Sequence, residues 1–146
     1  MLPYRFLLYT VLAFASVSCR ADTLKSEAEL RPLAEAVMAK AAANDIDAAF
    51  RLMGPFAIVS AAEYRSAALQ VAAQREQALA RYGKAIGYEL VGQRKFGESW
   101  MVLVFFEITA NHALPWTFHF FRSPNGWVIN SFQWSDKPQS IFGIIQ

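Results

Sequence analysis

Residues 115–134 read PWTFHFFRSPNGWVINSFQW, and they contain the clearest structural pattern of the chain. β-Branched and aromatic residues dominate on both sides of Ser123-Pro124-Asn125-Gly126, where proline and glycine favour a tight turn. Apolar side chains at every second position share one face of a strand. The stretch therefore predicts an antiparallel hairpin with strands at about 115–122 and 127–135. The first of these strands has one strongly apolar face, formed by Trp116, Phe118 and Phe120.

The sequence before this hairpin predicts two further strands, at about 86–96 and 99–109, from the same β-branched and aromatic composition. Phe96-Gly97-Glu98-Ser99 forms the turn between them, and Ala110 to Leu114 forms the turn to the next strand. Four consecutive strands with short connections predict an antiparallel meander.

The first half of the chain, residues 24–83, has helical periodicity. One apolar stripe at helical spacing comprises Leu30, Leu33, Ala34, Val37 and Ala41. Asn44 and Asp45 are expected to cap a short second helix, which Gly54-Pro55 ends with glycine in a left-handed exit conformation. Phe56 to Val59 predicts one brief strand. Ser60 and Glu63 form a capping box that opens a long third helix ending near Tyr82-Gly83. The fold class is therefore α+β, with N-terminal helices packed on a four- to five-stranded antiparallel sheet.

The first 21 residues have the pattern of a secretory signal peptide: a short basic start, an apolar run over 6–17 and small residues before a cleavage site. The apolar run is too short for a permanent transmembrane helix, which needs about 20 residues. Two processing routes stay open. Cleavage after Ala21 leaves residues 22–146 as a single domain, periplasmic or secreted. A permissive lipobox ending at Cys19, with Ser16 in place of the favoured leucine, would instead give a membrane-anchored lipoprotein.

The net charge argues against a nucleic-acid partner. The whole chain has 14 basic and 12 acidic residues, and two of the basic residues, Arg5 and Arg20, lie in the expected signal peptide, or leader. Without them the domain has 12 of each and a net charge of zero, so it lacks the basic excess of nucleic-acid-binding or surface-binding proteins. Cys19 is the only cysteine. A disulfide within the chain and a cysteine-based metal site are therefore excluded, and no metal or cofactor is expected.

The order of helix, short helix, brief strand, long helix and four strands resembles the nuclear transport factor 2-like superfamily, the cystatin-like α+β cone also seen in SnoaL-like proteins. The closing residues WTFHFF at 116–121 and NGWVINSF at 125–132 are similar to the last hairpin of small exported bacterial members of unknown function. The resemblance implies a curved sheet that wraps the long helix and leaves a pocket at its wide end.

The resemblance implies that enzymes of this cone type use an aspartate in the pocket. No aspartate of this chain can be assigned that role. The aspartates of the domain lie at expected helix starts or chain ends: Asp22, Asp45, Asp47 and Asp136. Three other residues are the candidates for polar chemistry. Glu107 stands in the apolar row of its strand, His119 lies among phenylalanines, and Arg75 interrupts the apolar stripe of the long helix, to which Tyr64 also belongs. If Arg75 faces the cone, we expect it to pair with Glu107 within about 4 Å.

A simpler interpretation of these residues stays open. It makes Glu107 solvent-facing, His119 a hydrogen-bonded wall residue and Arg75 a surface residue. Tryptophans supply a candidate aromatic pocket wall, with core packing as the alternative. They are Trp100, Trp116, Trp127 and Trp134. Because chain ends fray unless they dock, the apolar segment 141–145 is expected to pack on the domain or on a partner.

The sequence therefore favours a non-catalytic exported domain of the cell envelope, which uses its pocket or sheet face to bind a small apolar ligand, an envelope protein or a second copy of the chain. Any membrane contact would come only from the leader or a lipidated Cys19. The alternative is a small hydrolase or isomerase of the cone type, whose Glu107 and His119 would converge in one open cavity.

Overall fold

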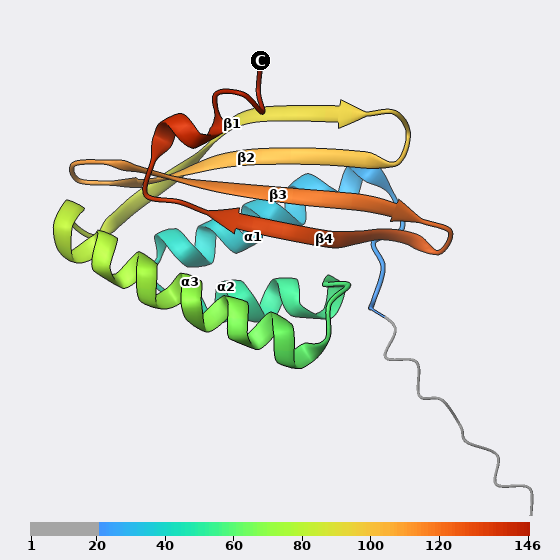
Figure 1. Cartoon of the computed structure of the whole chain (residues 1–146), viewed down its shortest axis with the longest axis horizontal. Helices are drawn as coiled ribbons and strands as arrows, with labels where there is room; N and C mark the ends of the chain where they lie inside the picture. The colour runs from blue at the N-terminus through green and yellow to red at the C-terminus, as the bar shows by residue number, and fades with distance from the viewer. Residues whose placement is uncertain (1–20) are drawn as a thin grey trace, which may run out of the picture.

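The computed structural model describes residues 21–146, so residues 1–20 of the expected signal peptide, including Cys19, lie outside the described residues. Three helices precede four strands along the chain (Figure 1). The helices are α1 (Leu30–Ala42), α2 (Ile46–Met53) and α3 (Ala61–Tyr82), and the strands are β1 (Ala85–Phe96), β2 (Trp100–Thr109), β3 (Ala113–Ser123) and β4 (Gly126–Trp134). Short 3-10 turns occur at η1 (Glu27–Glu29), η2 (Gly54–Phe56) and η3 (Pro138–Ile141).

The four strands form one antiparallel sheet in the order β1-β2-β3-β4. This is the predicted meander, and the α+β class with helices packed on a curved sheet is confirmed. Phe105 faces Trp116 across β2 and β3, and Trp116 faces Trp134 across β3 and β4. Alternate residues of each strand therefore fall into two sets, one on each face of the sheet.

The predicted helix signals are confirmed with two differences. Ser60 and Glu63 form the capping box of α3, and the Asp45 side chain accepts the hydrogen bond that caps α2. Asn44 does not share this role. Its backbone is left-handed at φ 62°, and its side-chain oxygen accepts a hydrogen bond from Arg75 instead. The expected left-handed exit at Gly54 is wrong. Gly54 has φ −49° because the chain continues directly into η2.

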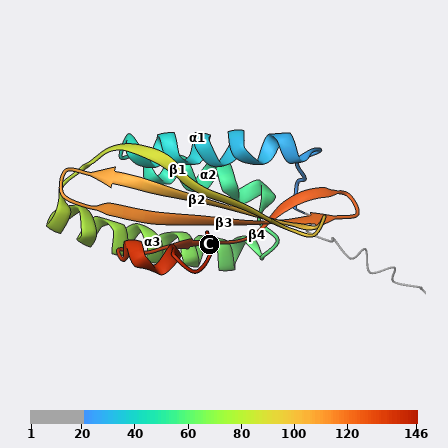
Figure 2. The same ribbon diagram turned by 90° about the horizontal axis from the view of Figure 1, so that it is seen from above.

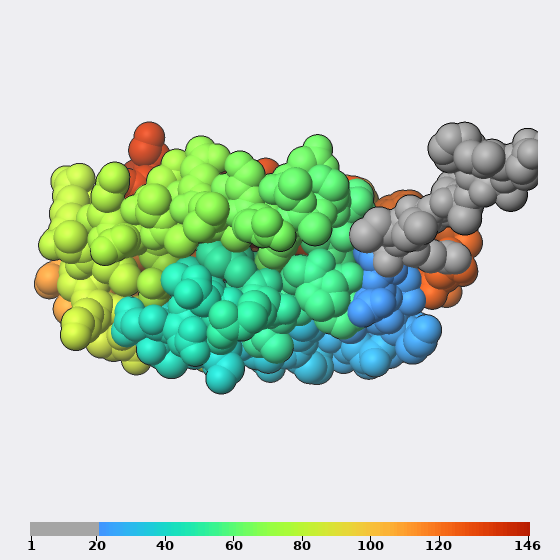
Figure 3. Space-filling view, turned by 90° about the horizontal axis from the view of Figure 1, so that it is seen from below, coloured from blue at the N-terminus to red at the C-terminus, as the bar shows by residue number. Residues whose placement is uncertain are grey.

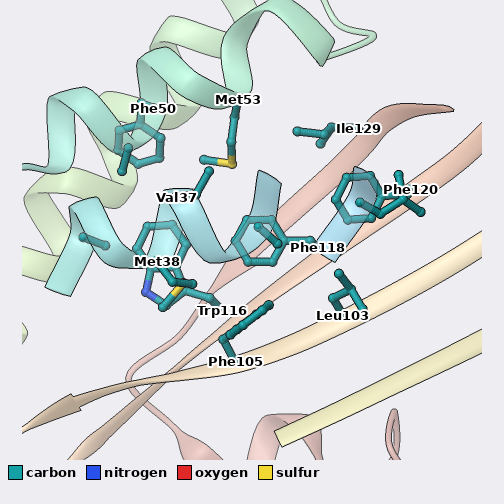
Figure 4. Close-up of a cluster of buried hydrophobic side chains, with 14 of the residues drawn as sticks. Val37, Met38, Phe50, Met53, Leu103, Phe105, Trp116, Phe118, Phe120 and Ile129 are labelled. Atoms are coloured by element: carbon teal, nitrogen blue, oxygen red, sulfur yellow. The ribbon is translucent and has the colours of Figure 1, made fainter. Parts of the chain in front are cut away.

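The main core lies between α1, α2 and one face of the sheet, here called the helix face. Fully buried aromatic rings from β2 and β3 pack against apolar side chains of the two helices (Figure 4). Phe105 and Phe118 meet edge to face with ring centroids 5.8 Å apart. Trp116 and Phe118, which share this face, both have 0% exposure, so the predicted apolar row of the closing hairpin is the centre of the core.

The C-terminal segment covers part of the opposite, outer face of the sheet, as Figure 2 shows from above. Ile141 and Ile144 pack on Val102 and Val104 of β2. A Cβ built on Gly92 would overlap the Ile145 side chain, so the absence of a side chain at Gly92 permits this close approach. The expectation that the apolar tail docks on the domain is therefore confirmed.

The brief strand expected at 56–59 is reduced to an isolated parallel bridge between Ala57 and Ile129. A second bridge joins Leu24 to Trp127 on the same strand. These two contacts protect one end of the β4 edge without adding a strand, so the described sheet has four strands. Within residues 21–146, none of the helices has the length and apolar character needed to cross a bilayer.

Candidate functional site

Arg75 and Glu107 form a buried ion pair between α3 and β2. Arg75 Nε lies 2.9 Å from Glu107 Oε1, and Arg75 Nη2 lies 2.5 Å from the same oxygen. The two side chains are brought together because Arg75 interrupts the buried stripe of α3 and Glu107 lies on the helix face of β2. The expected pairing is confirmed, whereas the alternative positions on the solvent side are wrong.

The remaining hydrogen bonds of this pair reach two further elements. Trp116 Nε1 of β3 donates to Glu107 Oε2 at 2.9 Å. Arg75 Nη2 also donates to the Ala41 carbonyl at 2.8 Å and to Asn44 Oδ1 at 3.3 Å. The Ala41 carbonyl lies at the C-terminal end of α1, where a positive charge is favourable. The cluster therefore connects α1, α3 and the two central strands.

Burial determines what this cluster can do. Glu107 and Trp116 have 0% exposure and Arg75 has 4%, so a substrate cannot reach the carboxylate without displacing packed side chains. Both oxygens of Glu107 already accept hydrogen bonds from protein donors. A carboxylate held in this way links structural elements, whereas a general base needs a substrate within hydrogen-bond reach.

His119 lies on the outer face of the sheet, away from Glu107. It alternates with Phe118 and Phe120 of the core and packs against Trp100, with ring centroids 5.9 Å apart. Its Nε2 is buried without a partner in the described structure, and burial lowers its pKa. The expected convergence of Glu107 and His119 in one cavity is therefore wrong, because a one-residue change in strand position reverses the face. Trp100 also lies on the outer face of the sheet, so it does not form the pocket wall that the sequence predicted.

Tyr64 has a structural contact on the helix face. Its hydroxyl donates to the Phe50 carbonyl at 2.6 Å and its ring packs on Phe132, so it ties the start of α3 to α2 and β4. Burial raises the pKa of the Tyr64 hydroxyl, which keeps it a neutral donor.

An open cavity of about 560 Å³ lies between the second half of α3 and the end of β4. In Figure 1, α3 runs below β4, and Figure 3 shows α3 beside α2 from below. Gln74, Gln77 and Arg81 line the α3 side, and Trp134, Asp136 and Lys137 line the other. Of these residues, only Trp134 is among the sequence-predicted pocket candidates. The polar residues of α3 follow the spacing i, i+3, i+7, which places them on one helix face but is equally typical of any solvent-exposed face.

Hydrogen bonds from the backbone and from side chains hold the loop that follows β4. Ser135 donates its N–H to the Pro115 carbonyl at 3.1 Å, and Lys137 N–H donates to Ser135 Oγ at 3.0 Å. His112 Nε2 donates to the Asp136 carbonyl at 2.8 Å, and its ring stacks on Tyr82 with centroids 4.1 Å apart. The wall of the cavity is therefore fixed before any ligand arrives, which lowers the entropic cost of binding.

A second open groove lies between α1 and the strands β1 and β2. Its charged side chains are paired with other charges, whereas within the described residues the cations of the α3–β4 cavity are not. That groove is about 660 Å³ in volume and has Met101 and Leu103 at its base. Its rim charges form ion pairs with other protein groups: Arg31 with Glu35 at 2.8 Å, and Glu27 with Lys95 at 2.9 Å. Arg81 and Lys137 have no acidic partner within residues 21–146.

The described residues include no group of three or more histidine, cysteine, aspartate or glutamate side chains placed to hold a metal ion. Comparisons with models of known protein families, with curated proteins and with solved structures found no match to this chain.

Proposed function

We propose that this chain is a non-catalytic, exported domain of the cell envelope that binds a small polar ligand in the cavity between α3 and β4. The main support for this proposal is the contrast between two polar regions of the domain. The Arg75–Glu107 pair is buried and hydrogen-bonded, whereas the cavity is open and lined by polar side chains that face solvent. Small-molecule sites are concave and combine apolar or aromatic walls with a few polar groups that fix the ligand. This cavity is more polar than most such sites, and its aromatic wall is Trp134.

The composition of the cavity changes the expected ligand class. An apolar ligand fits the sequence, but two glutamines, two cations and an aspartate around Trp134 favour a polar molecule. Element order supports a distant relationship to the nuclear transport factor 2-like superfamily, in which the wide end of the cone holds the pocket. The bridge between Ala57 and Ile129 would then be the remnant of a further strand.

A thermal-shift screen of small polar metabolites tests the binding role. Ligands that stabilise the wild-type domain should lose their effect in the Gln74→Ala/Gln77→Ala double variant, because stabilisation depends on the affinity of the folded state. Gln70→Ala is the matched control, since Gln70 is an exposed glutamine of the same helix outside the cavity. Ligands that stabilise all three proteins equally would place binding elsewhere and refute the assignment.

The export part of the proposal rests on the leader pattern. Protein isolated from its native host should lack roughly the first 18 to 21 residues, the range given by the two processing routes. Added lipid mass that disappears in Cys19→Ala would identify a lipoprotein. An intact mass that includes Met1 would contradict export.

A further inference from the structure

We infer that the ligand of the α3–β4 cavity is a small acidic sugar, a pyranose ring that carries one carboxylate. This inference rests on the proposed function and names the ligand class of the same site. It follows from three features of the cavity: its charges, its hydrogen-bonding amides and its aromatic wall.

The charges favour an anion. Arg81 and Lys137 approach the cavity from opposite walls, and within residues 21–146 neither has an acidic partner. Arg81 lies over the ring of Tyr82, with Cζ 5.1 Å from the ring centroid, and this contact favours a fixed position for the guanidinium group. Guanidinium groups bind carboxylates through paired hydrogen bonds. Asp136 is the single acid among the lining residues, so the lining has a net positive charge.

The amides and the aromatic ring favour a sugar over a simple anion. Gln74 and Gln77 lie one turn apart on α3, and each offers one acceptor and two donors to hydroxyl groups. Trp134 is half-buried and presents indole surface to the same cavity, which suits the apolar face of a pyranose ring. Asp136 can accept hydrogen bonds from further hydroxyls. The cavity volume of about 560 Å³ lies within the usual range of small-molecule sites.

Titration calorimetry at low ionic strength with D-glucuronate and D-glucose tests this inference, because the two sugars differ in the carboxylate. Glucuronate should bind, glucose should bind at least tenfold more weakly, and added salt should reduce the difference. Arg81→Gln should weaken glucuronate about tenfold, the fold-change of one charge-assisted hydrogen bond. Arg65→Gln, an exposed arginine near the start of α3, should leave the affinity unchanged. Asp136→Asn should tighten glucuronate, because it removes a like charge.

The results separate this inference from the proposed function. Equal affinity for glucose and glucuronate would overturn the carboxylate assignment while the cavity remains a sugar site. Absence of binding by both sugars, together with another ligand that depends on Gln74 and Gln77, would overturn the acidic-sugar class alone. Glucuronate affinity that is identical in wild type, Arg81→Gln and Arg65→Gln would show that the sugar does not occupy this cavity.

Discussion

Removing one partner of the Arg75–Glu107 pair should destabilise the domain more than removing both. Arg75→Met leaves the Glu107 carboxylate in a site with 0% exposure, and Glu107→Gln leaves a guanidinium group in a site with 4% exposure. Each single substitution should lower the free energy of unfolding by about 3–5 kcal/mol, the cost of an unpaired buried charge. A domain of this size has a total stability of about 5–15 kcal/mol, so both effects are large.

The double variant, Arg75→Met with Glu107→Gln, has no buried charge at this position. The amide oxygen that replaces one carboxylate oxygen of Glu107 still offers Trp116 Nε1 an acceptor. The losses are the donor to the Ala41 carbonyl and an acceptor for the new amide N–H2 group. Each unsatisfied neutral group costs about 1–3 kcal/mol, less than an unpaired buried charge, so the double variant should still be more stable than either single variant. Urea unfolding followed by circular dichroism gives the three free energies, with Arg65→Met as a surface control expected within about 0.5 kcal/mol of wild type. Additive effects of the two substitutions, to within about 0.5 kcal/mol, would show that the two charges do not stabilise each other.

Three further predictions concern the core, the tail and the outer face. Phe118→Ala should lower the free energy of unfolding by about 3–5 kcal/mol because it empties a fully buried aromatic site, and a wild-type urea midpoint would contradict this. Gly92→Ala should loosen the C-terminal segment because the added Cβ meets Ile145, so residues 141–146 should exchange amide hydrogens faster. Gly87→Ala, with no atom within 4 Å of its added Cβ, should leave this exchange unchanged. Burial lowers the pKa of His119, so the unfolded chain binds its proton more readily and wild-type stability should fall as pH drops below about 6.5. His119→Phe should reduce that fall, and an identical pH dependence of the urea midpoints would count against it.

The sequence predicted most of the fold because its signals are local. Hydrophobic alternation, the Pro-Asn-Gly turn and the Ser60–Glu63 capping box each depend on residues close together in the chain. The Arg75–Glu107 pair was also predictable, since each residue interrupts an apolar stripe and a buried charge needs a partner. These features depend on periodicity, which one sequence displays directly.

The sequence did not predict the candidate site as well, because a cavity depends on how elements meet. Glu107 and His119 both stand among apolar residues, yet register places them on opposite faces of the sheet. The cavity forms where the flank of α3 meets the loop after β4, and its two walls are far apart in the chain. Arg81 and Lys137 are ordinary surface charges in the sequence, and only the tertiary arrangement brings them to one cavity.

The most direct test of the binding site is a ¹⁵N–¹H nuclear magnetic resonance titration of the domain with D-glucuronate. We expect shifts in the Trp134 indole N–H and in the backbone amides of residues 74–82 and 135–137. The amides around Met101, in the groove beside α1, should not move. Shifts centred on that groove or on the outer face, or an unchanged spectrum at millimolar sugar, would show that the α3–β4 cavity does not bind the sugar.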